Sequence, residues 1–281
     1  MATPKVLPLQ GEVSVDASRT IRYSLFGADS NSPNSQSIIF IPGFKGFKDW
    51  GGWPWFCSQL AGFGHRVLSI NPSMCGVGPA LDQFDEPDKF AKQTLSHDIQ
   101  DMNVILDAVI SGFSGNGGSV LIGHSRGGLV AALTAGQRSD VTGVVSIGTP
   151  HDLVRISSEE IRMWREEGKR AVVNARTGEI LFQDLSVLED YIEKEDSYDA
   201  VSALGSAQVP ALGIHGTSDL AVSEDSLEIL HSKMRPDLTK KYLLSDGGHT
   251  LGLSHPYAGP HAHAEEALSV MRTWLEEVPS R

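Results

Sequence analysis

The stretch LIGHSRGG, residues 121–128, places one serine among small residues at the end of an apolar segment. Its centre, GHSRG at residues 123–127, fits the pattern Gly-x-Ser-x-Gly. Residues 119–122 have the composition of a buried strand, and residues 126–137 carry one apolar helical face. A serine at such a strand–turn–helix junction is typical of a nucleophile elbow, in which a strained turn exposes the hydroxyl. An ordinary turn would not need glycine two residues before and two residues after Ser125.

Short apolar segments alternate with helical patterns over most of the chain. An opening hairpin is expected over residues 13–15 and 19–26, and further strands at residues 37–41, 65–70, 119–122, 141–147, 210–214 and 241–244. Helices with one apolar face are expected at residues 95–109, 126–137 and 268–278. The predicted fold class is therefore α/β, with a mostly parallel central sheet of about eight strands and helices on both faces.

One region, residues 150–208, breaks this alternation. A helix is expected to begin at Ser157 and to end at Gly168, followed by a small hairpin over residues 172–182 and a short helix over residues 185–192. A segment of this length with its own structure is too long for a plain connection. It is therefore predicted to be a cap, or lid, inserted into the main domain.

Two later strand ends carry residues that could activate Ser125. One predicted strand is followed by HGTSD, which ends in Asp219, and the next is followed by SDGGH, which ends in His249. A serine hydroxyl is a weak nucleophile that needs a base, and the base needs an orienting partner. The chain order Ser125, Asp219, His249, with each residue beyond its own strand, predicts a catalytic triad.

Other assignments of these two loops stay open. Asp219 could instead cap the helix expected near residue 223, and Asp246 is a second carboxylate, although it lies too close to His249 in the chain to orient that ring easily. His255 is a second candidate base. The proline that follows it favours extended backbone, so His255 would have to fold back to reach the nucleophile.

The segment PGFKGF, residues 42–47, follows the predicted strand at residues 37–41. A tetrahedral intermediate needs two N–H donors for its oxyanion. The backbone N–H of Arg126, directly after the nucleophile, and the N–H of Phe44 are the candidates for this oxyanion hole. A simple Pro-Gly turn is the alternative for the first loop.

Three tryptophans are candidate substrate contacts. Trp50 and Trp53 follow the oxyanion loop in DWGGWPWF, and Trp164 lies in the predicted cap. Aromatic side chains here could wall a pocket for the substrate, but burial in the core is the alternative. We expect the cap to gate this pocket and to set the preference for the acyl group through its apolar residues, which are Ile161, Met163, Trp164, Leu181 and Phe182.

The composition excludes several classes of partner. The chain has 281 residues, the range of a single α/β domain over residues 1–281, and a net charge of −12. Nucleic acid and anionic membrane surfaces are therefore poor candidates as partners.

Two cysteines, Cys57 and Cys75, make no disulfide framework, and two free thiols are favoured over a single bridge. His261 and His263 resemble metal-ligand spacing but have no cysteine partner, so no metal site is predicted.

The N-terminal sequence MATPKVLPLQGEV lacks the apolar segment of a secretory signal. No apolar run approaches the length of a transmembrane helix. A cytoplasmic location is therefore expected, while the oligomeric state stays open.

Taken together, these motifs resemble those of the α/β-hydrolase superfamily. The resemblance rests on PGFKGF, GHSRGG, HGTSD and DGGH, in that order between residues 42 and 249. It is nearest to the branch with dienelactone-hydrolase-like, cinnamoyl-ester-hydrolase-like and prolyl-oligopeptidase-like members. Two features depart from that branch: Pro42 stands where a histidine is usual, and the cap is larger than in dienelactone-hydrolase-like enzymes, whose nucleophile is a cysteine.

The resemblance implies a serine hydrolase that cleaves a small carboxylic ester through an acyl-enzyme, with no metal or organic cofactor. A peptidase or amidase, a perhydrolase or an acyltransferase could use the same residues, although no propeller domain that filters peptides is evident in these 281 residues. A non-catalytic binding protein on the same fold is a rival from another class. Such proteins usually lose a member of the triad, whereas this chain has a candidate for each position.

Overall fold

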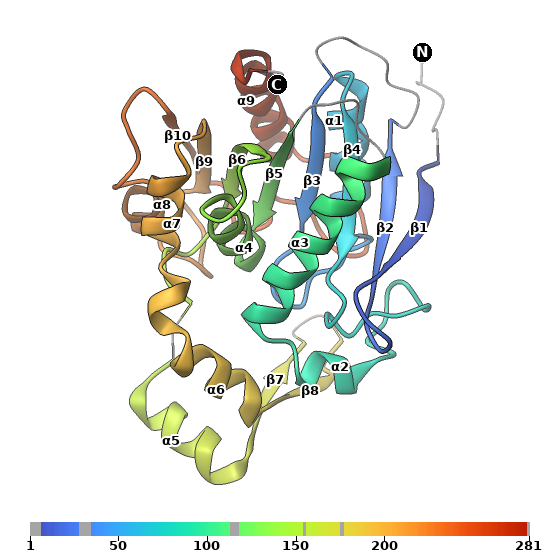
Figure 1. Ribbon diagram of the computed structural model, residues 1–281, viewed down its shortest axis with the longest axis vertical. Helices are drawn as coiled ribbons and strands as arrows, with labels where there is room; N and C mark the ends of the chain where they lie inside the picture. The colour runs from blue at the N-terminus through green and yellow to red at the C-terminus, as the bar shows by residue number, and fades with distance from the viewer. Residues whose placement is uncertain (1–6, 28–34, 113–117, 154–155, 175–176, 280–281) are drawn as a thin grey trace.

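The main body of the protein is a sheet between two layers of helices (Figure 1). The computed structural model describes residues 7–27, 35–112, 118–153, 156–174 and 177–279. Within these residues the sheet has eight strands, which are β1 (Leu9–Ser14), β2 (Thr20–Phe26), β3 (Ser37–Ile41), β4 (Arg66–Asn71), β5 (Ser119–His124), β6 (Val141–Ile147), β9 (Ala211–Gly216) and β10 (Thr239–Leu244). Their order is β1-β2-β4-β3-β5-β6-β9-β10. β2 is antiparallel to both of its neighbours and the other pairs are parallel, which confirms the predicted mostly parallel α/β sheet.

The central strands are buried on both faces, which explains their uninterrupted apolar sequences. In β3, Ile39 and Ile41 belong to the apolar core on one face of the sheet, and Ile38 and Phe40 belong to the core on the other face. This is the period-two alternation of a strand with two covered faces. β1, at the sheet edge, is mostly exposed, and its weak apolar pattern is the reason that the sequence predicted only its last residues.

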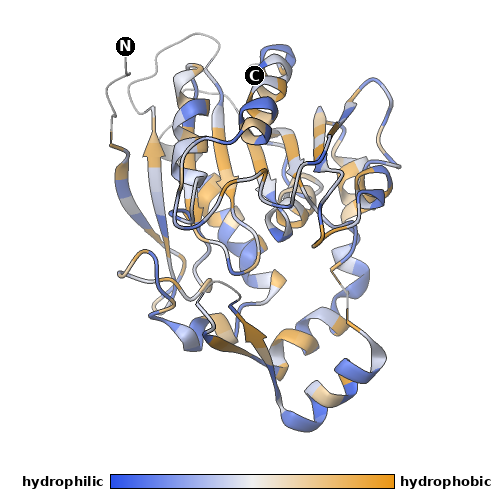
Figure 2. Cartoon of the chain, turned by 180° about the vertical axis from the view of Figure 1, so that it is seen from behind, coloured by the Kyte–Doolittle hydropathy of each residue, from blue (hydrophilic) through white to orange (hydrophobic). Residues whose placement is uncertain are grey.

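Helices cover both faces of this sheet. α1 (Trp53–Gly62) and α9 (Ala262–Glu277) lie on one face, where Leu60 and Trp274 enter the same core as Phe40. α3 (Leu95–Gly112), α4 (Arg126–Ala135) and α7 (Ala200–Ala207) cover the other face. Two short helices, α2 (Pro87–Ala91) and α8 (Asp225–Leu230), precede α3 and follow β9. Figure 2 shows apolar residues concentrated in the central strands and polar residues on the outer sides of the helices.

The elements expected for the cap lie together at one end of the molecule, below the sheet in Figure 1. They are α5 (Ser158–Glu167), β7 (Lys169–Val173), β8 (Ile180–Asp184), α6 (Leu185–Glu193) and the 3-10 helix η1 (Glu195–Tyr198). A capping box starts α5: the Ser157 hydroxyl accepts the N–H of Glu160, and the Glu160 carboxylate accepts the N–H of Ser157. The helix ends at Gly168, whose φ of 71° favours glycine.

The last helix of the range 150–208 does not stand apart with these elements. α7 lies against α4, and its residues Ala200 and Leu204 are fully buried in the main core. Its sequence, AVSALGSA, has few large apolar residues, so it carried no clear helical signal. The role of residues 150–208 as a lid stays a prediction.

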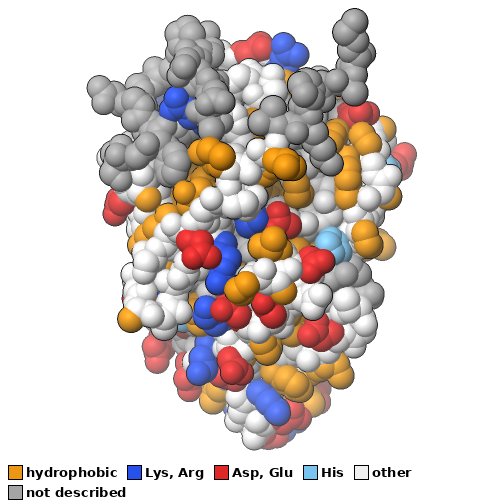
Figure 3. Space-filling view, turned by 90° about the vertical axis from the view of Figure 1, so that its right-hand side faces the viewer, with side chains coloured by type: hydrophobic (Ala, Val, Ile, Leu, Met, Phe, Trp, Pro, Cys, Tyr) orange, Lys and Arg blue, Asp and Glu red, His pale blue; other side chains and the backbone are white. Residues whose placement is uncertain are grey.

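The remaining sequence expectations concern cysteines, membrane spans and metals. Cys57 and Cys75 are both free and buried, and burial raises the pKa of each thiol to about 12. In the part of the chain that the structure describes, no helix is long and apolar enough to cross a bilayer. Within the same ranges no group of His, Cys, Asp and Glu side chains is arranged to hold a metal ion. On the side of the molecule shown in Figure 3, Lys and Arg side chains lie among Asp and Glu side chains.

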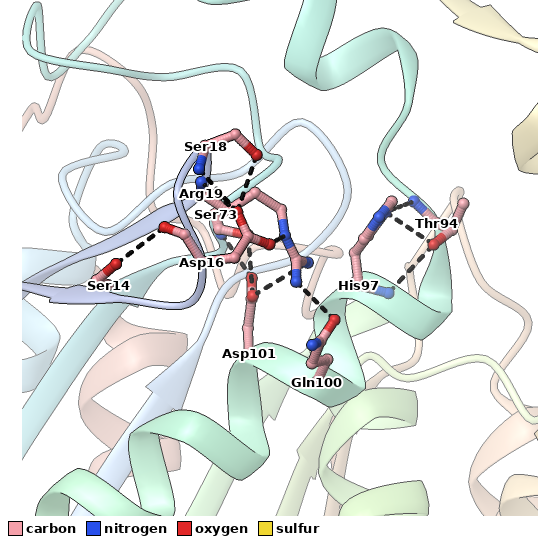
Figure 4. Close-up of polar contacts among 9 residues, drawn as sticks. All are labelled: Ser14, Asp16, Ser18, Arg19, Ser73, Thr94, His97, Gln100 and Asp101. Atoms are coloured by element: carbon pink, nitrogen blue, oxygen red, sulfur yellow. Dashed lines mark hydrogen bonds and ion pairs between the residues drawn. The ribbon is translucent and has the colours of Figure 1, made fainter.

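A buried carboxylate, Asp101 on α3, fastens the loop that follows β4 (Figure 4). Its two oxygens accept hydrogen bonds from the Ser73 N–H at 2.6 Å and the Ser73 hydroxyl at 2.8 Å, and an Arg19 nitrogen lies 3.8 Å away. Burial raises the pKa of Asp101 to about 7, with the nearby charge of Asp98 acting in the same direction against the bonds from Ser73. The folded protein therefore holds a proton on Asp101 at pH values where the unfolded chain has lost it.

Asp101→Asn should change how the stability of the protein depends on pH. Because the folded pKa of Asp101 lies above its ordinary value of 3.8, the folded state binds more protons between these values and its free energy of unfolding falls as the pH rises through them. The amide cannot ionise. Urea titrations measure the free energy of unfolding of both proteins at each pH. From about pH 4 to pH 8 we expect this free energy to fall for the wild type by on the order of 2 to 4 kcal/mol relative to Asp101→Asn.

Asp140→Asn is the control for this experiment. The hydrogen bond from Arg138 lowers the pKa of Asp140, so this carboxyl is ionised in both folded and unfolded protein above pH 5 and adds no slope there. The opposite result is a free energy of unfolding of the wild type that differs from that of Asp101→Asn by the same amount at every pH, as expected for Asp140→Asn. That result would show that Ser73 and Arg19 keep Asp101 ionised.

Candidate active site

Ser125 lies in a strained turn between β5 and α4. Its φ of 53° and ψ of −122° form a combination that residues with a Cβ rarely adopt. A Cβ on Gly123 would lie 2.2 Å from the carbonyl oxygen of Gly127, and a Cβ on Gly127 would lie 2.2 Å from the carbonyl oxygen of Ile41. Only glycine at both positions lets the strand and the helix approach this closely, which is the physical reason for the two glycines of GHSRG.

The loops after β9 and β10 bring Asp219 and His249 together. A main-chain hydrogen bond from the Ser218 N–H to the Gly247 carbonyl, 2.9 Å long, joins the two loops. Nδ1 of His249 lies 2.7 Å from Oδ2 of Asp219, whose side chain is only 1% exposed. A carboxylate can only accept a hydrogen bond, so Nδ1 of His249 carries the hydrogen and donates it to Asp219. Nε2 is then the basic nitrogen of the ring.

The surroundings of Asp219 keep it ionised. Its Oδ1 accepts the N–H of Ala221 at 2.8 Å and of Val222 at 2.9 Å. Its Oδ2 faces His249 and also lies 3.4 Å from Nε2 of His215. Burial by itself would raise the pKa of Asp219, but the bonds from His215, His249 and Val222 outweigh burial and hold that pKa well below its usual range. Asp219 can therefore fix the His249 ring as a carboxylate.

The turn that holds Ser125 contacts the His249 loop through His124. Nε2 of His124 lies 2.9 Å from the main-chain carbonyl oxygen of His249, and the two rings are 4.7 Å apart. Burial lowers the pKa of His124 to about 3, with the charge on His249 acting in the same direction, so His124 stays neutral beside the base. None of the hydrogen bonds among the described residues joins the Ser125 hydroxyl to His249; in free enzymes this bond is often long and tightens with substrate.

The loop after β3 lies directly against Ser125. A Cβ on Gly43 would be 3.0 Å from the Cβ of Ser125. The Gly46 N–H closes a tight turn by donating to the Gly43 carbonyl at 2.9 Å. Phe44 lies inside this turn, so the backbone expected to carry one oxyanion donor is a neighbour of the serine.

Side chains anchor the backbone of both predicted oxyanion donors. Nε of Arg126 donates to Oδ2 of Asp98 on α3 at 2.8 Å, and both side chains are buried. The ring of Phe44 stacks on the fully buried ring of Phe90, with centroids 5.4 Å apart. Anchored side chains limit movement of the attached N–H groups, as a preorganised oxyanion hole requires.

The three candidate tryptophans differ in exposure. Trp53 is 1% exposed, and its ring lies 4.9 Å from Phe40 in the main core. Trp164 is 5% exposed, donates its indole N–H to the Gln183 carbonyl at 3.2 Å and belongs to the small core of the cap. Both side chains therefore lie where the core alternative places them, and their role as substrate contacts stays a prediction. Trp50, which is only partly buried, stays a candidate.

The hairpin of β7 and β8 packs on the loop after β3. Its residues Val172 and Leu181 share an apolar cluster with Phe47 and Phe90, and Phe44 packs against the same cluster. Two other residues expected to line the pocket, Met163 and Phe182, are 45% and 41% exposed. Of the expected apolar cap residues, Leu181 is therefore the one in contact with the cluster beside the site.

His255 lies in the same loop as His249 but makes different contacts. Its Nδ1 accepts the Gly51 N–H at 2.7 Å. Its ring stacks on Trp50 at 5.7 Å and meets Phe47 edge-on at 5.6 Å. His255 thus joins the base loop to the segment after the oxyanion loop, whereas His249 is the histidine that meets Asp219.

One residue beside the site was not singled out from the sequence. His215 is buried in β9, and its Nε2 lies 3.0 Å from the Val222 carbonyl oxygen and 3.4 Å from Oδ2 of Asp219. The available signal was its place four residues before Asp219 at the end of an apolar strand. That signal is equally typical of a histidine that only fills the core.

The fold and the site can be compared with known proteins. No protein-family model and no curated protein sequence matches the chain. Among solved structures, Est1E from Butyrivibrio proteoclasticus, with ferulic acid bound, has a TM-score of 0.71 at 18% identity over 95% of this chain and 98% of its own. Alpha/beta hydrolase domain-containing protein 10 from mouse has a TM-score of 0.68 at 19% identity, over 96% of this chain and 99% of its own. The esterase domain of a Rhodothermus marinus protein has a TM-score of 0.65 at 16% identity, over 97% of this chain and 99% of its own. The chain therefore has the α/β-hydrolase fold over nearly its whole length.

Proposed function

We propose that the protein is a serine hydrolase that cleaves carboxylic esters through an acyl-enzyme intermediate. The observation that carries this proposal is the Asp219–His249 pair, with Oδ2 and Nδ1 2.7 Å apart. The pair contacts the strained Ser125 turn through His124. The similar solved structures include an esterase domain and a monoacylglycerol lipase, which favours an ester as the substrate.

The proposed reaction begins when Oγ of Ser125 attacks the ester carbonyl carbon while Nε2 of His249 takes the hydroxyl proton. The carbonyl oxygen becomes an oxyanion and accepts hydrogen bonds from the backbone N–H groups of Phe44 and Arg126. His249 then gives its proton to the leaving alcohol as the C–O bond breaks. Water, deprotonated by His249, attacks the acyl-enzyme and releases the acid, and Ser125 regains its proton.

Asp219 supports His249 in each of these steps. It accepts the Nδ1–H, which holds the ring with Nε2 toward the nucleophile, and its negative charge stabilises the imidazolium that forms. The low pKa of Asp219, held down against burial by its hydrogen bonds, keeps it a carboxylate throughout. No step in this route calls for a metal or an organic cofactor.

A fluorophosphonate probe and a substrate panel test the proposal. The probe should label the wild type once, at Ser125 by peptide mass spectrometry, and should not label Ser125→Ala. The panel contains aryl esters of graded acyl length, a ferulate ester and the matching amides, and kcat/KM is measured for each. We expect hydrolysis of the esters and little of the amides, because an amine is a poorer leaving group than an alcohol.

Each alternative has its own outcome. Faster turnover of amides than of esters would identify a peptidase or amidase. Faster acyl transfer to an added alcohol than to water would identify an acyltransferase. A folded protein with neither labelling nor turnover would identify a binding protein and contradict the proposal.

A further inference from the structure

We infer that His215 is a positioning residue of this site, which holds Asp219 and its loop in place for His249. The inference rests on the proposed function, because it concerns the same three residues. The side chains of Asp219 and His215 are each 1% exposed, so water does not screen the contact between them. Nε2 of His215 lies 3.4 Å from Oδ2 of Asp219, the oxygen that also meets Nδ1 of His249.

A neighbouring carbonyl decides which nitrogen of His215 carries a proton. Nε2 lies 3.0 Å from the carbonyl oxygen of Val222, and a carbonyl oxygen can only accept a hydrogen bond. Nε2 therefore bears a hydrogen. This N–H donates to Val222 and presents its positive end to Asp219, which is the more distant of the two acceptors.

Val222 closes the loop around the carboxylate. Its N–H donates to Oδ1 of Asp219 at 2.9 Å, beside the N–H of Ala221 at 2.8 Å, while its carbonyl accepts from His215. His215 belongs to β9 and lies opposite Leu243 in the parallel pairing with β10. The far end of the loop is thus tied to a buried strand, which fixes the direction in which Oδ2 points.

Loss of the His215 N–H should have two effects. The Val222 carbonyl would lose its donor inside the protein, so the loop would relax and kcat would fall as Asp219 loses its fixed direction. The Asp219 charge would also be less compensated and would stabilise the imidazolium of His249 more strongly. The acid limb of the kcat/KM profile, which reports protonation of the base in the free enzyme, should then move to higher pH.

The test compares His215→Met with His215→Gln in the full chain. Methionine fills similar volume without a donor, and glutamine keeps an N–H donor on a side chain of similar reach. For His215→Met we expect kcat to fall roughly 10- to 100-fold, with KM within about twofold because the buried His215 does not reach the substrate. The acid limb should rise by about half a pH unit. For His215→Gln we expect kcat within about threefold of wild type and an unshifted acid limb.

Two kinetic results would overturn the inference. One is a folded His215→Met variant with wild-type kcat and an unshifted acid limb. The other is an equal loss in folded His215→Gln and His215→Met variants, because then only the shape of the ring would matter. Melting temperature and near-UV circular dichroism establish that each variant is folded.

Nuclear magnetic resonance of the folded wild type decides the question if His215→Met does not fold. The Nε2–H of His215 should be observed and should shift in Asp219→Asn. His231, which is held by Ser146 at 3.0 Å and Thr239 at 2.8 Å, is the control whose signals should not shift. An Nδ1–H tautomer for His215, or no shift in Asp219→Asn, would overturn the inference. Failure of the proposed function is a separate result. In that case either the folded wild type would show no turnover of any ester, or Ser125→Ala would keep wild-type activity, whatever residue stands at position 215.

Discussion

Ser125→Ala is expected to abolish ester hydrolysis and leave the fold intact. The variant removes the proposed nucleophile, and loss of such a serine lowers kcat on the order of a millionfold in a well-studied hydrolase. Alanine keeps a Cβ, so the turn at φ 53° is as accessible to it as to serine. Initial rates on an aryl ester, together with the melting temperature, measure the two parts of this prediction.

Ser254→Ala is the matched control. Ser254 is an exposed serine in the loop after His249, and its hydroxyl donates to the Pro256 carbonyl at 2.9 Å. We expect this variant to keep nearly all of the activity. If Ser125→Ala retained more than a few per cent of the wild-type rate, Ser125 would not be the nucleophile.

The second large effect separates two histidines in one loop. His249→Ala should lower kcat by several orders of magnitude while the protein stays folded, because His249 is the ring held 2.7 Å from Asp219. His255→Ala removes the acceptor of the Gly51 N–H and a ring between Phe47 and Trp50, and not the partner of Asp219. Its cost should be far smaller, about tenfold or less, and should come from loosening of the loop.

Kinetics of both variants at neutral pH, with melting temperatures, measure this difference. An inactive His255→Ala protein beside an active His249→Ala protein would move the role of base to His255. The assignment of Ser125 would survive that result, since the fluorophosphonate adduct identifies the nucleophile independently. Equal and small losses in both variants would instead contradict a histidine base altogether.

Local signals in the sequence were sufficient for much of the fold. The apolar segment of β3 predicted a strand buried on both faces, because each face packs against its own layer of helices. The capping residues Ser157 and Gly168 predicted both ends of α5, because Ser157 accepts the N–H of Glu160 and Gly168 takes the left-handed conformation that favours glycine. The glycines of GHSRG predicted the strained turn, because a side chain on Gly123 would meet the start of α4 and one on Gly127 would meet the end of β3.

The candidate site was predictable in part for the same reason. The chain order of Ser125, Asp219 and His249, each after the end of its own strand, nominated these residues, and the structure brings the last two within 2.7 Å. Their meeting depends on the parallel register of β9 and β10, with Gly216 opposite Leu244. That register is set by packing over the whole sheet and has no signature in either strand alone.

Tertiary structure alone decided the roles of several other residues. Trp53 and Trp164 were expected as candidate walls of a substrate pocket, and their side chains lie in two different apolar cores. α7 looked like part of the cap and packs on α4. His215 was not singled out from the sequence, and its Nε2 lies 3.4 Å from Oδ2 of Asp219.

The division follows from the range of the forces involved. By itself the sequence determined backbone features that depend on neighbours within a few residues, such as strand alternation, helix caps and the glycine turn. Burial of an aromatic ring, or the sharing of Oδ2 of Asp219 between His215 and His249, depends on segments that meet only after the sheet has formed. Only the tertiary structure decided these contacts, because a side chain carries no information about which distant backbone will cover it.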